Sequence, residues 1–262
     1  PSAPLLLLFV PIVTHAQAGG TLVEARSLED EGRLAEALKR FRSAAEANPT
    51  SPEAHRGWLR LAIETGNWRE GERALRRYEN LEAGLVAPAR LGTRLYFRKQ
   101  QYDTALNWAR RYRRRDSTNW EPYHFLARIN VALQDFLTAE KMVESARLRS
   151  SDNQWIRLDD FLVNRGIGRL DEARAIAMSL SEEATNPSVH WTLARRLGQN
   201  LSSPEIVGLL ETGGAYLPGE APPLAEPVEE TRYRYWWARM NARLGREADA
   251  RAVQSAAADD FR

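Results

Sequence analysis

The sequence predicts an all-α protein, a solenoid of about six to seven antiparallel helix pairs. Large apolar residues recur at a step of 34 residues, in the column Leu34, Trp68, Tyr102, Phe136 and Leu170. Two further columns keep the same step, one of small residues and one of Gly and Gln. No segment has the sustained alternation of apolar and polar residues that is typical of a strand. Three coherent columns at one period indicate an internal repeat.

Each repeat is predicted to consist of two amphipathic helices joined by a tight turn. The turn column lies two positions before the large column and reads Gly32, Gly66, Gln100, Gln134 and Gly168. Glycine suits the positive φ that the end of a helix often requires. The small column lies three positions after the large one, where small side chains let the helices of a pair approach: Ala37, Gly71, Ala105, Ala139 and Ala173. The period predicts units at 18–51, 52–85, 86–119, 120–153 and 154–187, which bury their apolar faces by stacking.

The period slips after residue 187. Residues 188–200 and 203–213 still read as a helix pair, so we expect helical repeats over 19–213. A Gly/Pro-rich acidic loop is expected over 214–230, and a degenerate terminal helix pair over 231–262. Degenerate end repeats are typical of caps.

The pattern resembles the tetratricopeptide repeat family. The run from Gly32 to Ala37 reads Gly-Arg-Leu-Ala-Glu-Ala, which matches the Gly-x-aromatic-x-x-Ala turn signature except that Leu34 stands for the aromatic residue. Phe41 and Pro49 fall at later signature places of the same unit, and Tyr123 matches the first helix of the fourth unit. The resemblance implies a right-handed superhelical solenoid whose concave groove binds other proteins. It also implies that the repeats are not catalytic.

The first residues are typical of an export signal. Residues 5–13 form an apolar run, and Ala16-Gln17-Ala18 follows as an Ala-x-Ala cleavage motif. The run is shorter than the roughly 20 apolar residues that span a bilayer. We therefore expect 1–18 to be an apolar signal-like or anchor segment. It predicts a periplasmic protein, associated with the membrane if the segment is retained.

Composition excludes several kinds of chemistry. The chain of 262 residues has no Cys, which excludes disulfides, thiolate metal sites and a Cys nucleophile. No two of its four His are three or four positions apart, so a helical metal site is not predicted. Phosphate-binding loops and nucleophile elbows are absent from the sequence. We expect no enzyme activity, no cofactor and no metal.

Arginine dominates the predicted groove. The chain has 34 Arg and three Lys. The fifth and ninth positions of the units share one face of the first helix, because one helical turn separates them. We predict that this basic ladder binds an acidic protein partner: Arg56, Arg60, Arg90, Arg94, His124 and Arg128. The alternative is that some of these arginines pair with Glu53 and Glu64.

Two other features offer docking surfaces. Residues 51–119 hold 15 Arg and Lys against 8 Asp and Glu, and Arg110 to Arg115 form a nearly continuous basic run. The run suits a helix C-terminus, and anionic lipid headgroups are a second use for it. Nucleic acid is not the partner we expect for an exported protein. Aromatic and apolar residues near the C-terminus are candidate docking residues: Tyr216, Leu217, Trp236 and Trp237.

The sequence therefore predicts a non-catalytic protein-protein interaction scaffold. By analogy with the family, the favoured role is an extrinsic periplasmic subunit or assembly factor that docks on a membrane-embedded complex and stabilises it. One alternative is a soluble periplasmic adaptor or chaperone that binds acidic peptides in the Arg-lined groove. Another is a polysaccharide-binding or export factor that uses its aromatic residues and arginines.

Overall fold

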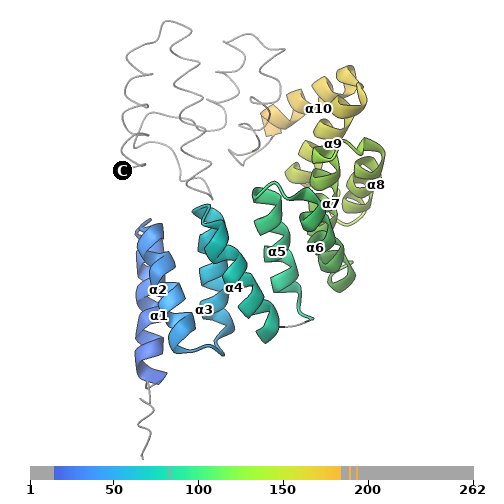
Figure 1. The fold of residues 1–262 in the computed structure, drawn as a ribbon. Helices are drawn as coiled ribbons and strands as arrows, with labels where there is room; N and C mark the ends of the chain where they lie inside the picture. The colour runs from blue at the N-terminus through green and yellow to red at the C-terminus, as the bar shows by residue number, and fades with distance from the viewer. Residues whose placement is uncertain (1–14, 83, 184–188, 190–192, 194–262) are drawn as a thin grey trace, which may run out of the picture. The chain divides into compact units, whose positions relative to one another are not determined.

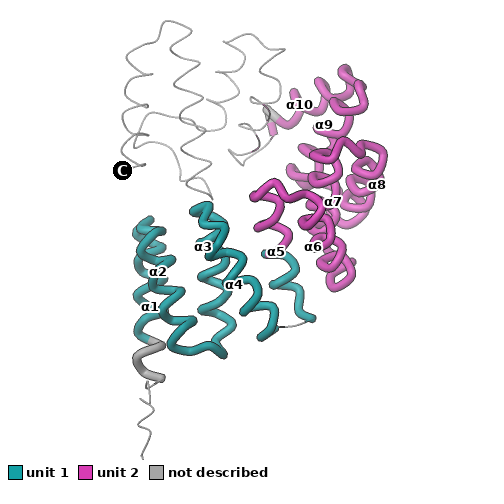
Figure 2. The backbone as a smooth tube through the Cα atoms, in the orientation of Figure 1, with its two compact units in different colours: residues 1–91 teal, residues 92–262 magenta. Residues whose placement is uncertain are grey.

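The computed structural model describes residues 15–82, 84–183, 189 and 193, and this part of the chain contains ten α-helices and no strand (Figure 1). The chain divides into two compact units, residues 1–91 and 92–262 (Figure 2). The predicted all-α architecture of consecutive helix pairs is confirmed for the described residues.

The first unit contains two helix pairs and the beginning of a third. Its helices are α1 (His15–Asp30), α2 (Leu34–Ala47), α3 (Pro52–Glu64) and α4 (Trp68–Leu81), followed by the first residues of α5 (Val86–Arg98). The first four helices pack consecutively, α1 on α2, α2 on α3 and α3 on α4. We call the odd-numbered helices A helices and the even-numbered ones B helices.

The second unit continues the same alternation. After the rest of α5 it contains α6 (Tyr102–Arg115), α7 (Glu121–Ala132), α8 (Phe136–Arg147), α9 (Gln154–Ile167) and α10 (Leu170–Glu183). Here α7 contacts α8 within its pair and α9 in the following pair. Contact between successive A helices places side chains of neighbouring repeats next to each other.

Every described B helix begins at the large apolar column of the 34-residue repeat. The five helices start at Leu34, Trp68, Tyr102, Phe136 and Leu170. The small column three positions later is buried in all five repeats. The periodic columns therefore coincide with the first residue of each described B helix and with the face that it buries.

The turn column adopts a left-handed backbone at all five positions. Gly32, Gly66 and Gly168 have φ of 75°, 69° and 94°, and Gln100 and Gln134 have φ of 60° and 63°. A residue with a Cβ is strained in this region by roughly 1–2 kcal/mol. The repeat geometry therefore imposes the left-handed turn even where the sequence offers no glycine.

Close approach of an A helix to a B helix depends on glycine within each unit. In the first unit, a Cβ on Gly57 of α3 would lie 2.3 Å from Cδ1 of Phe41 in α2. In the second unit, a Cβ on Gly92 would lie 2.5 Å from Cε3 of Trp108. Both rings are buried, so the missing methyl groups let aromatic side chains fill the space between helices.

The predicted units after residue 187 lie outside the described residues, apart from Val189 and Leu193, which are buried against the core of α9 and α10. The loop 214–230 and the terminal pair 231–262 also lie outside them. Helix α1 begins at His15, so the last four residues of the segment 1–18 are helical. None of the described helices has both the length and the apolar character needed to cross a membrane.

Candidate functional site

The six residues of the predicted basic ladder are divided between the two units. Arg56, Arg60 and Arg90 belong to the first unit and Arg94, His124 and Arg128 to the second. Arg56 and Arg90 are exposed, whereas the other four side chains are half-buried. The binding role of the ladder stays a prediction, but the structure shows different surroundings for its members.

In the first unit, Arg60 is engaged in ion pairs. Its guanidinium donates to the carboxylate of Glu29 in α1 and lies 3.5 Å from Glu64 of its own helix. Burial by itself lowers the pKa of Arg60, and the two carboxylates raise it again above its usual value. Arg60 thus links two successive A helices, and its charge is already balanced.

A second ion pair joins the same two helices, this time from an arginine of α1 to a glutamate of α3. Arg26 holds the ninth position of the first repeat and pairs with Glu53 of α3. Glu53 and Glu64 are therefore occupied by Arg26 and Arg60, which agrees in part with the alternative that ladder arginines pair locally. Glu29 was not among the predicted partners, because it lies 31 residues before Arg60 and is not a neighbour on the same helix.

In the second unit, Arg128 lines a pocket of about 580 Å³, which we call the Arg128 pocket. Its guanidinium carbon lies 5.8 Å from the ring centroid of Phe97, within the range of a cation–π contact. Arg165 of α9 lines the same pocket, and neither arginine makes an ion pair within the part of the chain that the structure describes. Their positive charges are not compensated there.

The rest of the Arg128 pocket is largely apolar. Its walls include the first residues of α6, α8 and α10, which are Tyr102, Phe136 and Leu170. Phe97 and Leu162 also line it. The large column of the repeat therefore has two functions in this unit, since it starts each B helix and lines the pocket. Leu170 is 58% exposed, which leaves an apolar side chain accessible at the rim.

Arg165 was not among the predicted site residues. It is the twelfth residue of the fifth unit, one turn after Leu162, which holds the ninth position. The prediction considered only the fifth and ninth positions, and a third helical column would have included Arg165. Arg165 therefore lies on the same helix face as the two columns that were considered, one turn further along the helix.

His124 has a structural partner in the next repeat. Its Nδ1 lies 2.6 Å from Oδ2 of Asp159, a carboxylate that is 1% exposed. The rings of Trp120 and Trp155 lie 5.6 and 6.2 Å from the His124 ring. The imidazole thus bridges α7 and α9 within a small aromatic cluster.

The other predicted features have different outcomes. Arg113, Arg114 and Arg115 occupy the last turn of α6, where positive charge complements the helix C-terminus. The candidate docking residues Tyr216, Leu217, Trp236 and Trp237 lie outside the described residues. Among the described residues, no group of three or more His, Asp and Glu side chains could hold a metal ion.

Comparison with known proteins supports the repeat assignment. Residues 28–89 match the tetratricopeptide repeat family model, and no curated protein matches the chain. A solved tetratricopeptide repeat protein from Parabacteroides merdae is similar over 93% of both chains, with 14% identity and a TM-score of 0.63.

Two further solved structures have the same fold. A thermophilic protein of this type from Thermus thermophilus is 20% identical, covers 69% of this chain and 98% of its own, and has a TM-score of 0.56. The Cut9-Hcn1 hetero-tetramer of the APC/C contains a chain that is 13% identical, with coverages of 82% and 42% and a TM-score of 0.61. Residues 28–89 thus carry a tetratricopeptide repeat sequence, and the chain has the fold of tetratricopeptide repeat proteins.

Proposed function

We propose that this chain is a non-catalytic interaction scaffold whose Arg128 pocket binds an acidic and apolar segment of a partner protein. One observation carries the proposal: two guanidinium groups, those of Arg128 and Arg165, share a pocket with aromatic and aliphatic side chains and have no carboxylate partner in the described part of the chain. A pocket that combines apolar walls with a few polar or charged groups is the usual form of a binding site.

The chemistry of the pocket favours a peptide with two kinds of side chain. A carboxylate of the partner accepts charge-assisted hydrogen bonds from the planar fork of an arginine. An adjacent aliphatic or aromatic side chain contacts Phe97, Phe136 and Leu162 in the same pocket. Recognition then combines a charge pair that sets the register with apolar burial that supplies most of the affinity.

The fold agrees with this role. The tetratricopeptide repeat fold suggests a protein-interaction scaffold, and one structural neighbour is part of a hetero-tetramer by its own description. The partner class proposed for this chain rests on the chemistry of the Arg128 pocket.

Peptide binding to charge-neutralised variants tests the proposal. The probe is a fluorescein-labelled peptide with alternating Glu and Phe, compared with the same peptide carrying Lys in place of Glu. We expect Arg128→Gln or Arg165→Gln to weaken binding of the Glu peptide by about tenfold or more, because each removes a charge-assisted hydrogen bond. Arg114→Gln is the matched control, since Arg114 lies twelve residues along α6 from Tyr102, roughly 18 Å away.

The affinities of the Glu and Lys peptides at different salt concentrations give the decisive comparison. The wild-type protein should bind the Glu peptide more weakly as salt rises and should not bind the Lys peptide. Equal loss of affinity in Arg114→Gln and Arg128→Gln would show a general charge effect and would contradict a site at the Arg128 pocket. Binding that is indifferent to all three substitutions would contradict it as well.

The compartment and the partner class complete the proposal. We propose that the scaffold is an extrinsic periplasmic subunit or assembly factor of a membrane-embedded complex, on the basis of the apolar run 5–13 and the Ala-x-Ala motif that follows it. Purification of the native protein from gently solubilised membranes tests this. Recovery in stoichiometric amounts with one integral membrane complex is the expected result, and recovery alone in the soluble fraction would contradict it.

A further inference from the structure

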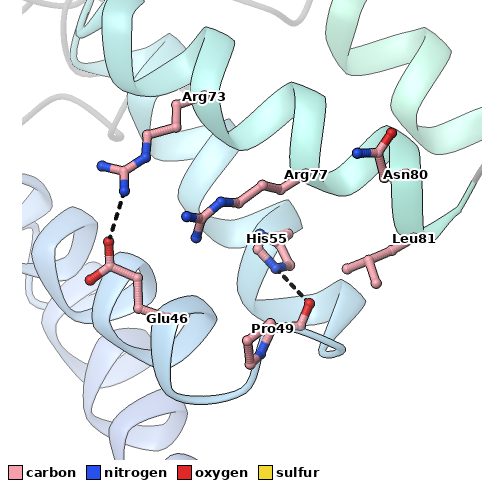
Figure 3. Close-up of a pocket in the computed structure, with 7 residues that line it drawn as sticks. All are labelled: Glu46, Pro49, His55, Arg73, Arg77, Asn80 and Leu81. Atoms are coloured by element: carbon pink, nitrogen blue, oxygen red, sulfur yellow. Dashed lines mark hydrogen bonds and ion pairs between the residues drawn. The ribbon is translucent and has the colours of Figure 1, made fainter.

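A second pocket lies in the first unit, and no residue of the predicted ladder lines it. Its volume is about 530 Å³, and it is formed where α2 ends, where α3 begins and along the second half of α4 (Figure 3). We call it the His55 pocket. It belongs to a different unit from the Arg128 pocket and shares no residue with it.

His55 lines this pocket with one ring nitrogen unpartnered. The side chain is fully buried, and Nε2 donates a hydrogen bond to the carbonyl oxygen of Pro49 at 3.0 Å. Because Nε2 carries the hydrogen, Nδ1 of the neutral ring has only its lone pair. Nδ1 is buried and makes no hydrogen bond within the described residues. Most buried polar atoms have a partner within the protein or in ordered water, so a buried Nδ1 without a protein partner is unusual.

Arg77 supplies an uncompensated positive charge beside His55. Its guanidinium carbon lies 5.7 Å from the ring centroid of Trp58, and it forms no ion pair in the described part of the chain. The other guanidinium of the pocket, that of Arg73, lies 3.5 Å from the carboxylate of Glu46. Figure 3 shows Arg73 facing Glu46, and Arg77 beside His55. One of the two cations is thus balanced and the other is not.

We propose that the His55 pocket binds an oxyanion, a carboxylate or phosphoryl group on a short stem, between the guanidinium of Arg77 and Nδ1 of His55. Arginine binds both groups through its planar fork of donors. Asn80 adds an amide at the wall, and Leu81 adds an apolar surface against which a short stem packs. The proposal does not depend on the Arg128 pocket.

Binding of the oxyanion is coupled to proton uptake at His55. Without a bound anion, burial lowers the pKa of His55, the hydrogen bond to Pro49 partly opposes this, and the charge of Arg77 lowers the pKa again, which favours the neutral ring. To donate to an oxyanion, Nδ1 must gain a hydrogen, and the ring becomes an imidazolium. The charged groups that line the pocket are Glu46 from α2 and Arg73 and Arg77 from α4. The bound anion offsets the repulsion between Arg77 and the imidazolium.

Calorimetry on the full chain tests the site with two probes. Sulfate is a tetrahedral dianion whose charge is constant between pH 5 and 8, and it stands in for a phosphoryl group; succinate stands in for an acidic side chain. We expect saturable binding that tightens as the pH falls, with about one proton taken up per anion in buffers of different ionisation enthalpy. Binding of sulfate alone assigns a phosphorylated ligand, and binding of succinate alone or of both assigns a carboxylate.

Two substitutions on the same helix localise the binding. Arg77→Gln should weaken it by about tenfold or more, whereas the neighbouring exposed Arg76→Gln should leave it unchanged. In the ¹⁵N spectrum of the histidines, the His55 signals should move to the imidazolium position on saturation with the anion. The signals that disappear in His55→Gln are those of His55. If His55→Gln does not fold, the loss of affinity in Arg77→Gln still tests the site.

Three results would overturn the proposal. They are a failure of both sulfate and succinate to bind, equal affinity in Arg77→Gln and Arg76→Gln, and saturation without any change in the His55 signals. Each would mean that water satisfies Nδ1 and that the pocket is part of the packing between repeats.

Discussion

Nδ1 of His124 lies 2.6 Å from Oδ2 of Asp159, and this contact joins α7 to α9, the A helices of two successive repeats. Asp159 is buried, and its other carboxylate oxygen has no hydrogen-bond partner within the described residues. A buried carboxylate that loses its only partner is strongly destabilising, whereas replacing both partners by apolar residues is often nearly neutral. The pair therefore gives a specific expectation for the second unit.

We expect His124→Phe to lower the free energy of unfolding by about 3 kcal/mol, because it keeps a ring but leaves Asp159 unpaired. The double variant His124→Phe, Asp159→Leu should recover most of this loss. Urea unfolding followed by circular dichroism measures both. If the double variant is no more stable than His124→Phe, an unpaired Asp159 carboxylate is not the cause of the loss, and the expectation is wrong.

The turn column predicts a stabilising change at two positions. Gln100 and Gln134 have φ near 60°, a conformation that glycine adopts without strain. Gln100→Gly and Gln134→Gly should each raise the free energy of unfolding by about 0.5–1 kcal/mol, the relieved strain less the extra entropy of a glycine in the unfolded chain. Gln101→Gly is the control, since φ of Gln101 is −90° and the change there should destabilise.

The same substitution should have opposite effects at two glycines of the first unit. Gly57→Ala would place a methyl group 2.3 Å from the buried ring of Phe41, and we expect a loss of about 1–3 kcal/mol from overpacking. Gly20→Ala meets no atom within 4 Å and lies in α1, so it should gain roughly 0.5–1 kcal/mol from helix propensity. Thermal unfolding of the two variants checks the signs, and a shift of both in the same direction would contradict the close approach of α2 and α3.

Stability of the first unit should fall in acid because of His55. Its pKa is lower in the folded protein than in the unfolded chain, since burial disfavours the imidazolium. The unfolded chain therefore binds the proton first, and stability present above about pH 6.5 is lost as the pH falls below that value. Urea unfolding at pH 7.5 and 5.5, in a buffer free of sulfate and carboxylates, measures the loss. His55→Gln should show a smaller loss than the wild type, and an equal loss in both would assign the acid sensitivity to other groups.

Periodicity made the backbone of each described repeat predictable. A helix turns by a constant angle per residue, so residues three and four apart define a face without knowledge of the rest of the fold. The column from Leu34 to Leu170 recurs at the first residue of every described B helix for this reason. The turn column also located the left-handed residues, including Gln100 and Gln134, whose identities alone would not have indicated positive φ.

Contacts between repeats were less predictable. The sequence suggested that some ladder arginines pair with Glu53 and Glu64, and the structure pairs Arg60 with Glu64 and also with Glu29 of the preceding A helix. Arg165 was missed although it lies near Arg128 in the same pocket. Such contacts depend on how far and at what angle one helix packs on the next, which a self-alignment of the sequence does not contain.

The amino-acid sequence was enough to predict an all-α repeat protein, the turn between the helices of each described pair and the character of each helix face, because these follow from interactions within a turn or two of helix. Which charges are balanced depends on the tertiary structure. Arg60 pairs with Glu29 and His124 pairs with Asp159, whereas Arg77 and Arg128 have no carboxylate partner in the described part of the chain. Neutralisation and desolvation depend on distances of a few ångströms between side chains of different helices, and packing alone sets those distances.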